Sequence, residues 1–328
     1  MIAAPIGPPT TAATAPVASI AQVAPATGSI GLRLVDIPVA AVNDPRARLY
    51  IIDRLAPATT ISRRIEVSNT TGSTARIELY AAAASIADGA FLGAASRTPN
   101  DLSTWTSVRP GTADVPAGGK LTADVGIAVP ADAAPGEQYG VVWAEVRSGT
   151  PSGGITQVSR VGLRLYVSVG PGGAPASDFT ILSLTPGRSA TGLPTVRASV
   201  RNTGGRALDM TGTLRLLAGP GGLSAGPFPA NLGTTLGIGE TEPVTIVLDE
   251  SIPAGPWDAR IALHSGLLDR SARATITFPA AGSGPVVATA DSGRGRLYAA
   301  VAAAVLLLLL AGVLVALLRR RRRAAPAR

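Results

Sequence analysis

The feature that most constrains the fold of this chain is a period-two alternation of apolar and polar residues between residues 31 and 280. The stretches 61–68, 75–80 and 121–129 show it most clearly. Such alternation predicts strands that bury one face and expose the other. Turn sequences rich in Asn, Gly and Pro separate these stretches, as they do in antiparallel sheets. The sequence therefore predicts an all-β fold.

A segment without strand character, residues 170–177 (GPGGAPAS), divides this region in two. Each half repeats one order of features: a strand, a turn beginning at Asn69 or Asn202, a second strand, a Gly-rich turn, and a strand that leads into a Pro-Gly turn. This weak internal repeat predicts two related domains, at residues 31–169 and 178–280. Immunoglobulin-like β-sandwiches are the architecture that such short strands favour. Because the chain has no cysteine, each sandwich must depend on core packing instead of disulfides.

Near the end of the sequence, residues 297–318 form an apolar run without a charge. A helix of this length spans about 33 Å, which is enough for the hydrocarbon core of a bilayer. Five arginines follow at 319–323, and such flanks stay in the cytoplasm. The sequence thus predicts one C-terminal transmembrane α-helix, a basic cytoplasmic tail at 319–328 and both β domains outside the cytoplasm. Residues 281–296 are the expected linker to the membrane.

Residues 1–30 are rich in Ala, Pro and Thr and contain no Lys or Arg. Prolines interrupt every apolar run, so the basic start and apolar core of a signal peptide are not recognisable. We expect a disordered segment, with two alternatives for export: a natural start upstream of Met1, of whose signal residues 1–30 are the remnant, which we favour, or an unrecognised signal.

The net charge of +8 does not indicate a nucleic-acid-binding protein. Six of the 29 basic residues lie in 319–328, which leaves 23 basic groups against 21 acidic groups in the rest of the chain. Nucleic-acid binding needs a basic patch on a folded face, and we expect none. Lys120 is the only lysine, a bias that indicates a GC-rich genome of the actinobacterial type.

Residue types that carry catalysis or bind metals are sparse. The single histidine, His264, has the outward parity of its strand, so a metal site would need carboxylates alone. No Gly-x-Ser-x-Gly sequence occurs, and the Gly-Pro-Gly-Gly sequences at 170 and 219 lack the Lys-Ser/Thr of a phosphate-binding loop. We therefore predict no enzymatic activity, no cofactor and no metal.

Three aromatic residues, Trp105, Tyr139 and Trp143, are candidates for ligand binding. Tyr139 and Trp143 share one strand parity, opposite to that of Val142. If the valine side faces the core, both aromatics lie on the surface, where aromatic rings bind glycans or partners by stacking. Trp105 lies in a polar stretch. A structural role is the alternative, and the related position of Trp257 in the second half favours it.

Several features follow one another in a fixed order over residues 31–169. They are Tyr50, the strand Ile61–Val67 with its turn at Asn69, the stretch Ala81–Phe91, Val115–Gly118, Val129-Pro130 and Pro135–Trp143. In this order they resemble the DUF916 family, the peptidoglycan-binding domain of WxL-interacting proteins. Members of that family continue with a second β domain, a transmembrane helix and a basic tail. The resemblance implies binding of peptidoglycan or of another surface protein.

Together these observations predict a non-enzymatic, single-pass cell-surface protein that binds peptidoglycan or a surface protein through its β domains. The alternative is a passive stalk or scaffold subunit whose edge strands pair with another chain. A third reading is an exported glycan-active enzyme, which would need two acidic side chains facing one cleft. Nothing in the sequence nominates such a pair.

Overall fold

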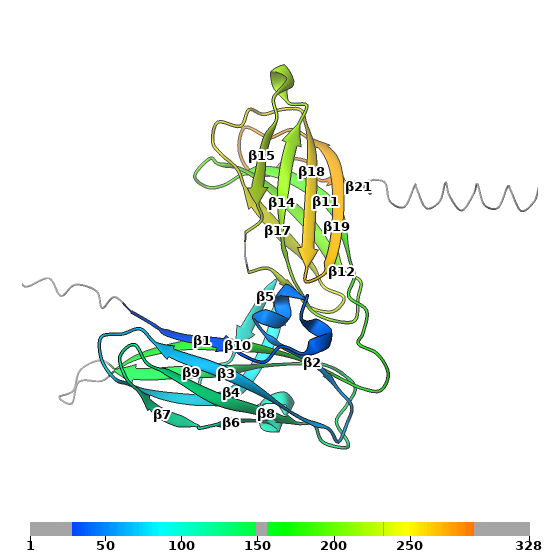
Figure 1. Ribbon diagram of the computed structural model, residues 1–328. Coiled ribbons are helices and arrows are strands. Elements are labelled where there is room, and N and C mark those ends of the chain that lie inside the picture. Colours follow the sequence, from blue (N-terminus) through cyan, green and yellow to red (C-terminus); the bar gives the residue numbers. More distant parts are fainter. Residues whose placement is uncertain (1–27, 149–155, 232, 292–328) are drawn as a thin grey trace, which may run out of the picture.

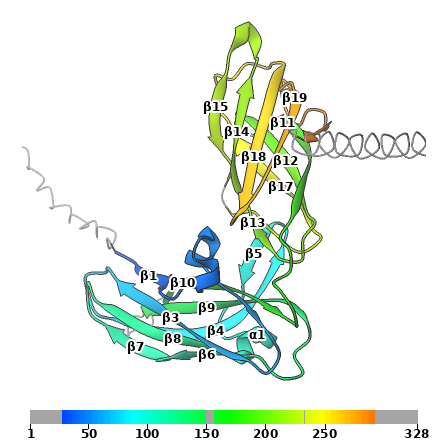
Figure 2. The ribbon, with the colours of Figure 1, turned by 45° about the vertical axis from the view of Figure 1, so that its right-hand side comes forward.

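The computed structural model of the chain describes residues 28–148, 156–231 and 233–291 (Figure 1). They form two β-sandwiches, and the second rises at a large angle from one end of the first (Figures 1 and 2). The prediction of an all-β fold with two sandwiches is confirmed. Within the described ranges no helix is long and apolar enough to cross a membrane. The predicted transmembrane helix at 297–318 and the tail at 319–328 lie outside these ranges, as do residues 1–27.

The first sandwich packs two sheets face to face. One has the strand order β1-β3-β8-β6, and the other has the order β2-β10-β9-β4, with β5 and β7 also pairing with β4. All pairs are antiparallel except β2 with β10, which is an immunoglobulin-like arrangement. The strands are β1 (Ile30–Leu34), β2 (Ile51–Leu55), β3 (Thr60–Asn69), β4 (Ala75–Ala87), β5 (Ala90–Gly93), β6 (Thr106–Arg109), β7 (Thr112–Val115), β8 (Lys120–Ala128), β9 (Gly136–Ser148) and β10 (Gln157–Val169).

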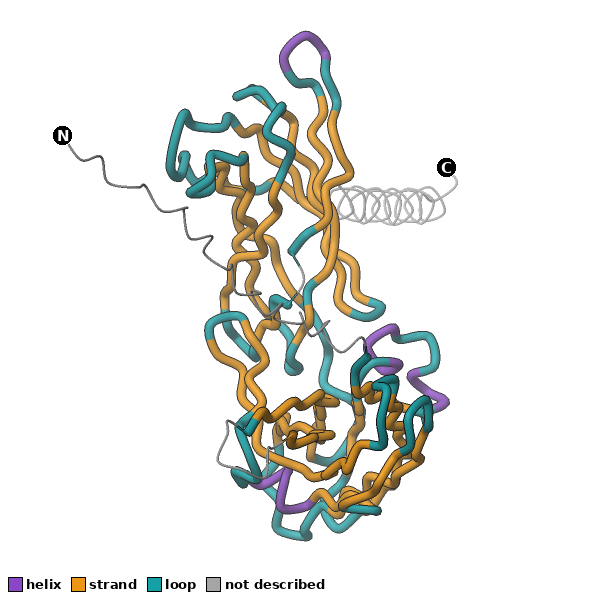
Figure 3. The backbone as a smooth tube through the Cα atoms, turned by 90° about the vertical axis from the view of Figure 1, so that its left-hand side faces the viewer, coloured by secondary structure: helices purple, strands orange, loops and turns teal. Residues whose placement is uncertain are grey.

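Three short helical turns interrupt this sandwich. Two 3-10 turns, η1 (Val39–Ala41) and η2 (Pro45–Arg48), lie between β1 and β2 and face the second sandwich (Figure 3). The third is α1 (Asp101–Trp105), whose N-cap residue is Asn100. The Asn100 side chain accepts a hydrogen bond from the Ser103 amide at 2.9 Å, a cap that satisfies one of the free amides at a helix start.

The second sandwich also has two main sheets, with the strand orders β17-β12-β11-β20 and β15-β14-β18-β19-β21, and a small pair β13-β16. Its strands are β11 (Phe179–Arg188), β12 (Pro194–Asn202), β13 (Leu208–Asp209), β14 (Thr211–Leu217), β15 (Ala225–Pro229), β16 (Thr235–Leu236), β17 (Thr241–Val247), β18 (Trp257–Ser265), β19 (Leu268–Ile276), β20 (Val287–Ala288) and β21 (Ala290–Asp291), with a 3-10 turn η3 at Pro220–Gly222.

The prediction that residues 281–296 are only a linker needs correction. β20 pairs with β11, and β21 pairs with β19, so these two short strands contact both sheets of the second sandwich. Val287 also packs partly against the core. The segment is rich in Gly, Ala and Ser, so the contact of Val287 with the core could not be predicted from its composition. Residues 292–296 lie outside the described ranges.

The apolar positions of the sequence alternation lie on the core side of the sheets, and the polar positions lie on the solvent side. In the first sandwich Ile65, Val67 and Ile77 are buried, and in the second Val196 and Val200 are buried, each with no accessible surface. Burial of one such side chain stabilises the fold by about 1.5–3 kcal/mol. His264, which has the opposite parity on β18, is exposed as predicted.

Each sandwich contains the same buried asparagine. Asn69, at the end of β3, donates from Nδ2 to the carbonyls of Ser73 and Val115, both at 2.9 Å. Its Oδ1 accepts from the Thr71 amide at 2.9 Å. Because Val115 ends β7 in the facing sheet, this side chain ties the turn to both sheets.

The second half reproduces the contacts within the turn at the same spacing, together with a bond to a distant carbonyl. Asn202, at the end of β12, donates to the carbonyls of Arg206 at 2.8 Å and Leu236 at 3.3 Å. Its Oδ1 accepts from the Gly204 amide at 3.0 Å. The Asn turns that mark the internal repeat are therefore two copies of one cross-sheet tie.

Replacement of either asparagine should destabilise the protein. Asn69→Ala or Asn202→Ala leaves buried backbone groups without partners, and we expect the free energy of unfolding to fall by roughly 2–4 kcal/mol. Urea denaturation followed by tryptophan fluorescence measures this. Asn231→Ala is the control, since Asn231 is exposed and its loss should change stability by less than about 0.5 kcal/mol. Equal losses of stability at all three positions would contradict the role of Asn69 and Asn202 as cross-sheet ties.

Candidate functional site

Trp143 lies on the outer face of the β9 sheet, the side that its strand parity predicts. Its ring is half-buried, because it lies flat across two glycines: a Cβ at Gly93 or Gly162 would lie 2.7 or 2.6 Å from the ring. Its Nε1 donates to the Ala94 carbonyl at 3.0 Å, and the Arg160 guanidinium lies 4.9 Å from the ring centre. The ring thus already has contacts on the sheet side and on the solvent side.

Tyr139 lies on the same face of β9, toward the second sandwich. Its hydroxyl donates to Glu137 Oε2 at 2.9 Å, and that oxygen also accepts from the Ala207 amide of the second sandwich at 2.6 Å. Burial, more than any other cause, raises the pKa of both Tyr139 and Glu137. Tyr139 therefore belongs to the junction between the sandwiches.

Trp105 does not join the other two candidates. It ends α1 and packs against the core of the first sandwich, although its sequence neighbours are polar. Tyr139 and Trp143 lie on the outer face of β9, so the three aromatics form no common surface. Ligand binding by Trp105, Tyr139 and Trp143 stays a prediction.

A buried carboxylate connects the two sandwiches. Asp209, on β13 of the second sandwich, accepts from Arg46 Nε at 2.9 Å and from Arg164 at 2.9 Å, both in the first sandwich. Tyr166 and Thr235 donate their hydroxyls to it at 3.0 and 2.9 Å. Only 15% of the Asp209 side chain and 10% of that of Arg46 are exposed. Burial disfavours the charge of Arg46, but Asp209 opposes this and raises the pKa of Arg46.

An aromatic cluster surrounds this ion pair. The Tyr166 ring lies 5.7 Å from that of Tyr50, 5.3 Å from that of Phe91 and 5.9 Å from that of Tyr139, centre to centre. The Arg46 guanidinium lies 5.0 Å from the Tyr166 ring. Tilted aromatic pairs and cation–π contacts each add about 0.5–1.5 kcal/mol beyond area burial. The cluster fixes the ends of β2, β5, β9 and β10 against the second sandwich.

The β4–β5 hairpin makes a further contact. Gly89 at its tip accepts a hydrogen bond from the Thr235 amide at 2.7 Å, and Figure 2 shows β5 reaching β13. Sequence reasoning missed this whole junction, which we call the Asp209 junction. Arg46 and Asp209 are 163 positions apart, and neither has a sequence neighbour that signals the other.

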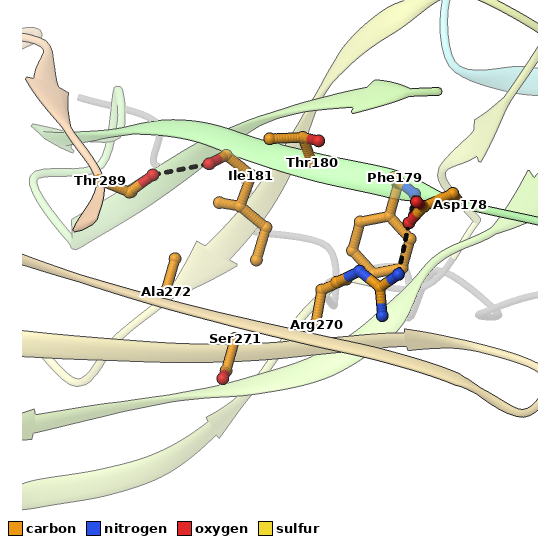
Figure 4. A pocket seen from close by; sticks show the side chains of 8 residues that line it. All are labelled: Asp178, Phe179, Thr180, Ile181, Arg270, Ser271, Ala272 and Thr289. Carbon is orange, nitrogen blue, oxygen red and sulfur yellow. Dashed lines mark hydrogen bonds and ion pairs between the residues drawn. The ribbon is translucent and has the colours of Figure 1, made fainter. Parts of the chain in front are cut away.

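A pocket of about 240 Å³ opens along the side of the second sandwich, between β11 and β19 (Figure 4). Its floor is apolar, with Phe179, Ile181 and Ala272. The exposed ion pair of Asp178 with Arg270, at 2.6 Å, closes one end. At the other end Thr289, between β20 and β21, donates its hydroxyl to the carbonyl of Ile181 at 2.6 Å. The pocket is thus a gap in the side of the sandwich that β20 and β21 only partly close.

At the junction Arg46 and Arg164 pair with Asp209, and Glu137 accepts hydrogen bonds from Tyr139 and Ala207. His264 is exposed on the outer face of β18. In the part of the chain that the structure describes, no group of three or more His, Cys, Asp or Glu could hold a metal ion.

One edge of β10 is only partly covered by a neighbouring strand. On one side β10 pairs along its length with β9, but on the other side β2 pairs only with Leu165–Val169. Among the described residues, no strand pairs with the second side of Val158–Arg164. Val158 is 46% exposed. This part of β10, which we call the open edge, leaves backbone donors and acceptors available.

Comparisons with known proteins add little to this geometry. No protein-family model matches the chain, and no curated protein matches it. Several solved structures are similar to this chain at a low level. The CupB2 chaperone of Pseudomonas aeruginosa is 12% identical with a TM-score of 0.36, over 70% of this chain and 98% of that one. The E. coli chaperone DraB is 9% identical with a TM-score of 0.38, over 76% and 99%.

A third similarity is shorter. A family 123 glycoside hydrolase from Clostridium perfringens is 9% identical with a TM-score of 0.29, over 43% of this chain and 27% of that one. Values of this size carry no conclusion about function, which must come from the residues themselves.

Loss of the Asp209 carboxylate should loosen the junction. Asp209→Asn leaves Arg46 buried without a counter-charge, and we expect the free energy of unfolding to fall by about 3–5 kcal/mol. Because the chain has no cysteine, spin labels at Thr122→Cys and Thr275→Cys report the distance between the sandwiches, and the distance distribution should broaden.

The matched control is Asp258→Asn. Asp258 also pairs with an arginine, Arg260 at 2.8 Å, but both side chains are exposed, at 31% and 56%. Asp258→Asn should lower the free energy of unfolding by no more than about 1 kcal/mol and leave the distribution of distances between the spin labels narrow. A narrow distribution in Asp209→Asn as well would show that the carboxylate does not hold the sandwiches together.

Proposed function

We propose that this chain is a non-enzymatic cell-surface protein that binds another surface protein by strand addition at the open edge of β10. Residues 297–318 anchor it in the membrane, the tail at 319–328 is cytoplasmic, and both sandwiches lie outside. The anchor rests on the uncharged run and the arginines that follow it.

The observation that carries the binding proposal is the open edge itself. Proteins protect exposed sheet edges with prolines, bulges or very short strands. Three edge strands here follow this rule: Pro227 and Pro229 lie in β15, Pro243 lies in β17 and Pro110 follows β6. The open edge contains no proline between Val158 and Arg164.

The charged residues of the open edge do not cover it. The Arg160 guanidinium lies over the Trp143 ring, and Arg164 binds Asp209 at 2.9 Å. Both side chains therefore lie on the face of the sheet. The backbone of Val158–Arg164 remains available to an extended segment, which would add main-chain hydrogen bonds to the β10 sheet.

The Asp209 junction supports the same function. It fixes the second sandwich against the end of β10, because Arg164 and Tyr166 of that strand bind Asp209. A binding edge that is held on a rigid element loses less conformational entropy when a partner binds.

Site-specific photo-crosslinking tests the open edge. A benzophenone side chain at Val158 should form an adduct with a surface protein on intact cells. The matched position is Val247, which is 38% exposed on the edge strand β17 that contains Pro243, and it should form none. An adduct at both positions, or at neither position in correctly folded variants, would refute strand addition at β10.

Peptidoglycan is the other ligand that the resemblance of residues 31–169 implies. A sedimentation assay of the full chain with purified cell walls separates the two ligands. We expect no more pelleting than for a control β-sandwich protein. Saturable pelleting without an adduct at Val158 would replace the protein partner with the wall.

A further inference from the structure

Three arginines lie side by side on the outer face of the second sandwich. Arg215 on β14 is directly opposite Arg260 on β18, and Arg260 is directly opposite Arg273 on β19. All three are exposed, so the expectation that no folded face carries a basic patch is wrong for this sheet. Since adjacent strands are about 4.8 Å apart, the row places three positive charges within about 10 Å along the sheet.

This arginine row destabilises the sheet, because like charges on directly opposite residues repel each other. Asp258 compensates Arg260 at 2.8 Å. Within the described ranges Arg215 and Arg273 form no ion pair with the chain. Two guanidinium groups therefore lie beside a third without an acidic partner among the residues that the structure describes.

The row lines a shallow recess of about 290 Å³ on this face. Thr213 and Ser271, in the next cross-strand row, line it together with the arginines. Guanidinium groups supply several N–H donors in a planar fork, the geometry that binds phosphate oxygens in pairs. The chemistry of the recess thus fits a phosphate group.

The row also lies next to the point where the chain runs toward its proposed anchor. Arg273 is directly opposite Ala290 of β21, and Asp291 is the last described residue. Five residues separate Asp291 from Leu297, so the two residues are at most about 22 Å apart. If residues 297–318 enter the bilayer, this sheet lies close to its surface.

We infer that Arg215, Arg260 and Arg273 bind the phosphate headgroups of anionic lipids and dock the second sandwich against the bilayer. The inference rests on the proposed anchor at 297–318. Near an anionic surface each basic side chain contributes an attraction that shifts the ratio of docked to undocked protein about five-fold. The sandwich is held near the surface by its own tether, so a few such contacts suffice to orient it.

Energy transfer from the sandwich to the bilayer tests the docking. Thr275 is exposed on the same face as the arginine row, and Thr275→Cys gives a single labelling site because the chain has no cysteine. The full chain is incorporated into phosphatidylcholine vesicles with or without phosphatidylglycerol, with a headgroup acceptor in both. Transfer should be larger with phosphatidylglycerol and should fall when salt rises from about 0.1 M to about 1 M, since screening shortens the range of the attraction.

Two matched double variants decide whether the row is responsible. Arg215→Gln with Arg273→Gln should reduce the docked-to-undocked ratio about 25-fold, which is five-fold for each arginine. Arg197→Gln with Arg201→Gln removes the same charge from the opposite sheet, where both residues are exposed on β12, and should leave the transfer unchanged.

The outcomes separate the inference from the function on which it rests. Failure of the chain to float with vesicles of either composition would overturn the anchor and the docking together. Flotation with equal transfer in both lipid compositions, or an equal loss in the two double variants, would overturn only the docking. The crosslink at Val158 is independent of all three results.

Discussion

The arrangement of the two sandwiches depends on one buried carboxylate. Asp209 lies among Arg46, Arg164, Tyr166 and Thr235, and three of these four residues belong to the other sandwich. A charge that is largely removed from water, with 15% of its side chain exposed, is tolerated only when its partners are in place. Separation of the sandwiches would leave buried groups on both sides without partners. The junction thus couples the orientation of the second sandwich to the end of β10, and with it the relative positions of the open edge and the arginine row.

Within each sandwich a second polar group has a comparable role. Asn69 and Asn202 make the same hydrogen bonds within their turns, at the same spacing, and each also donates to a distant carbonyl, in two halves whose other residues differ widely. The shared requirement is geometric: a turn between facing sheets exposes backbone groups to the interior, and one amide side chain satisfies them from both sides. The internal repeat is therefore present in the structure as well as in the sequence. The shared hydrogen bonds explain why the turn sequence recurs while the sequences of the strands differ.

Sequence reasoning reached the features that depend on local pattern. Alternation predicts the strands and the sides on which Ile65 and Val196 are buried. It could not find the Asp209 junction, since ion pairing between residues 163 positions apart leaves no local signal. It also could not show that Trp143 is half-covered, because that depends on the glycines of β5 and β10 that lie beside it in space. The sequence did not predict the two strands within 287–291, because each contains only two residues.

The open edge and the arginine row share one property that separates them from the rest of the surface. Each costs stability or risks aggregation, a cost that is reduced at some other positions, through prolines in β15 and β17 and through the pairing of Arg33 with Glu66. Natural sequences stay just above the stability that function requires, so a feature that lowers stability without internal compensation is explained best by an external partner. An extended protein segment satisfies the backbone of β10. Phosphate groups satisfy Arg215 and Arg273, and the tether at Asp291 supplies the proximity that makes weak contacts sufficient.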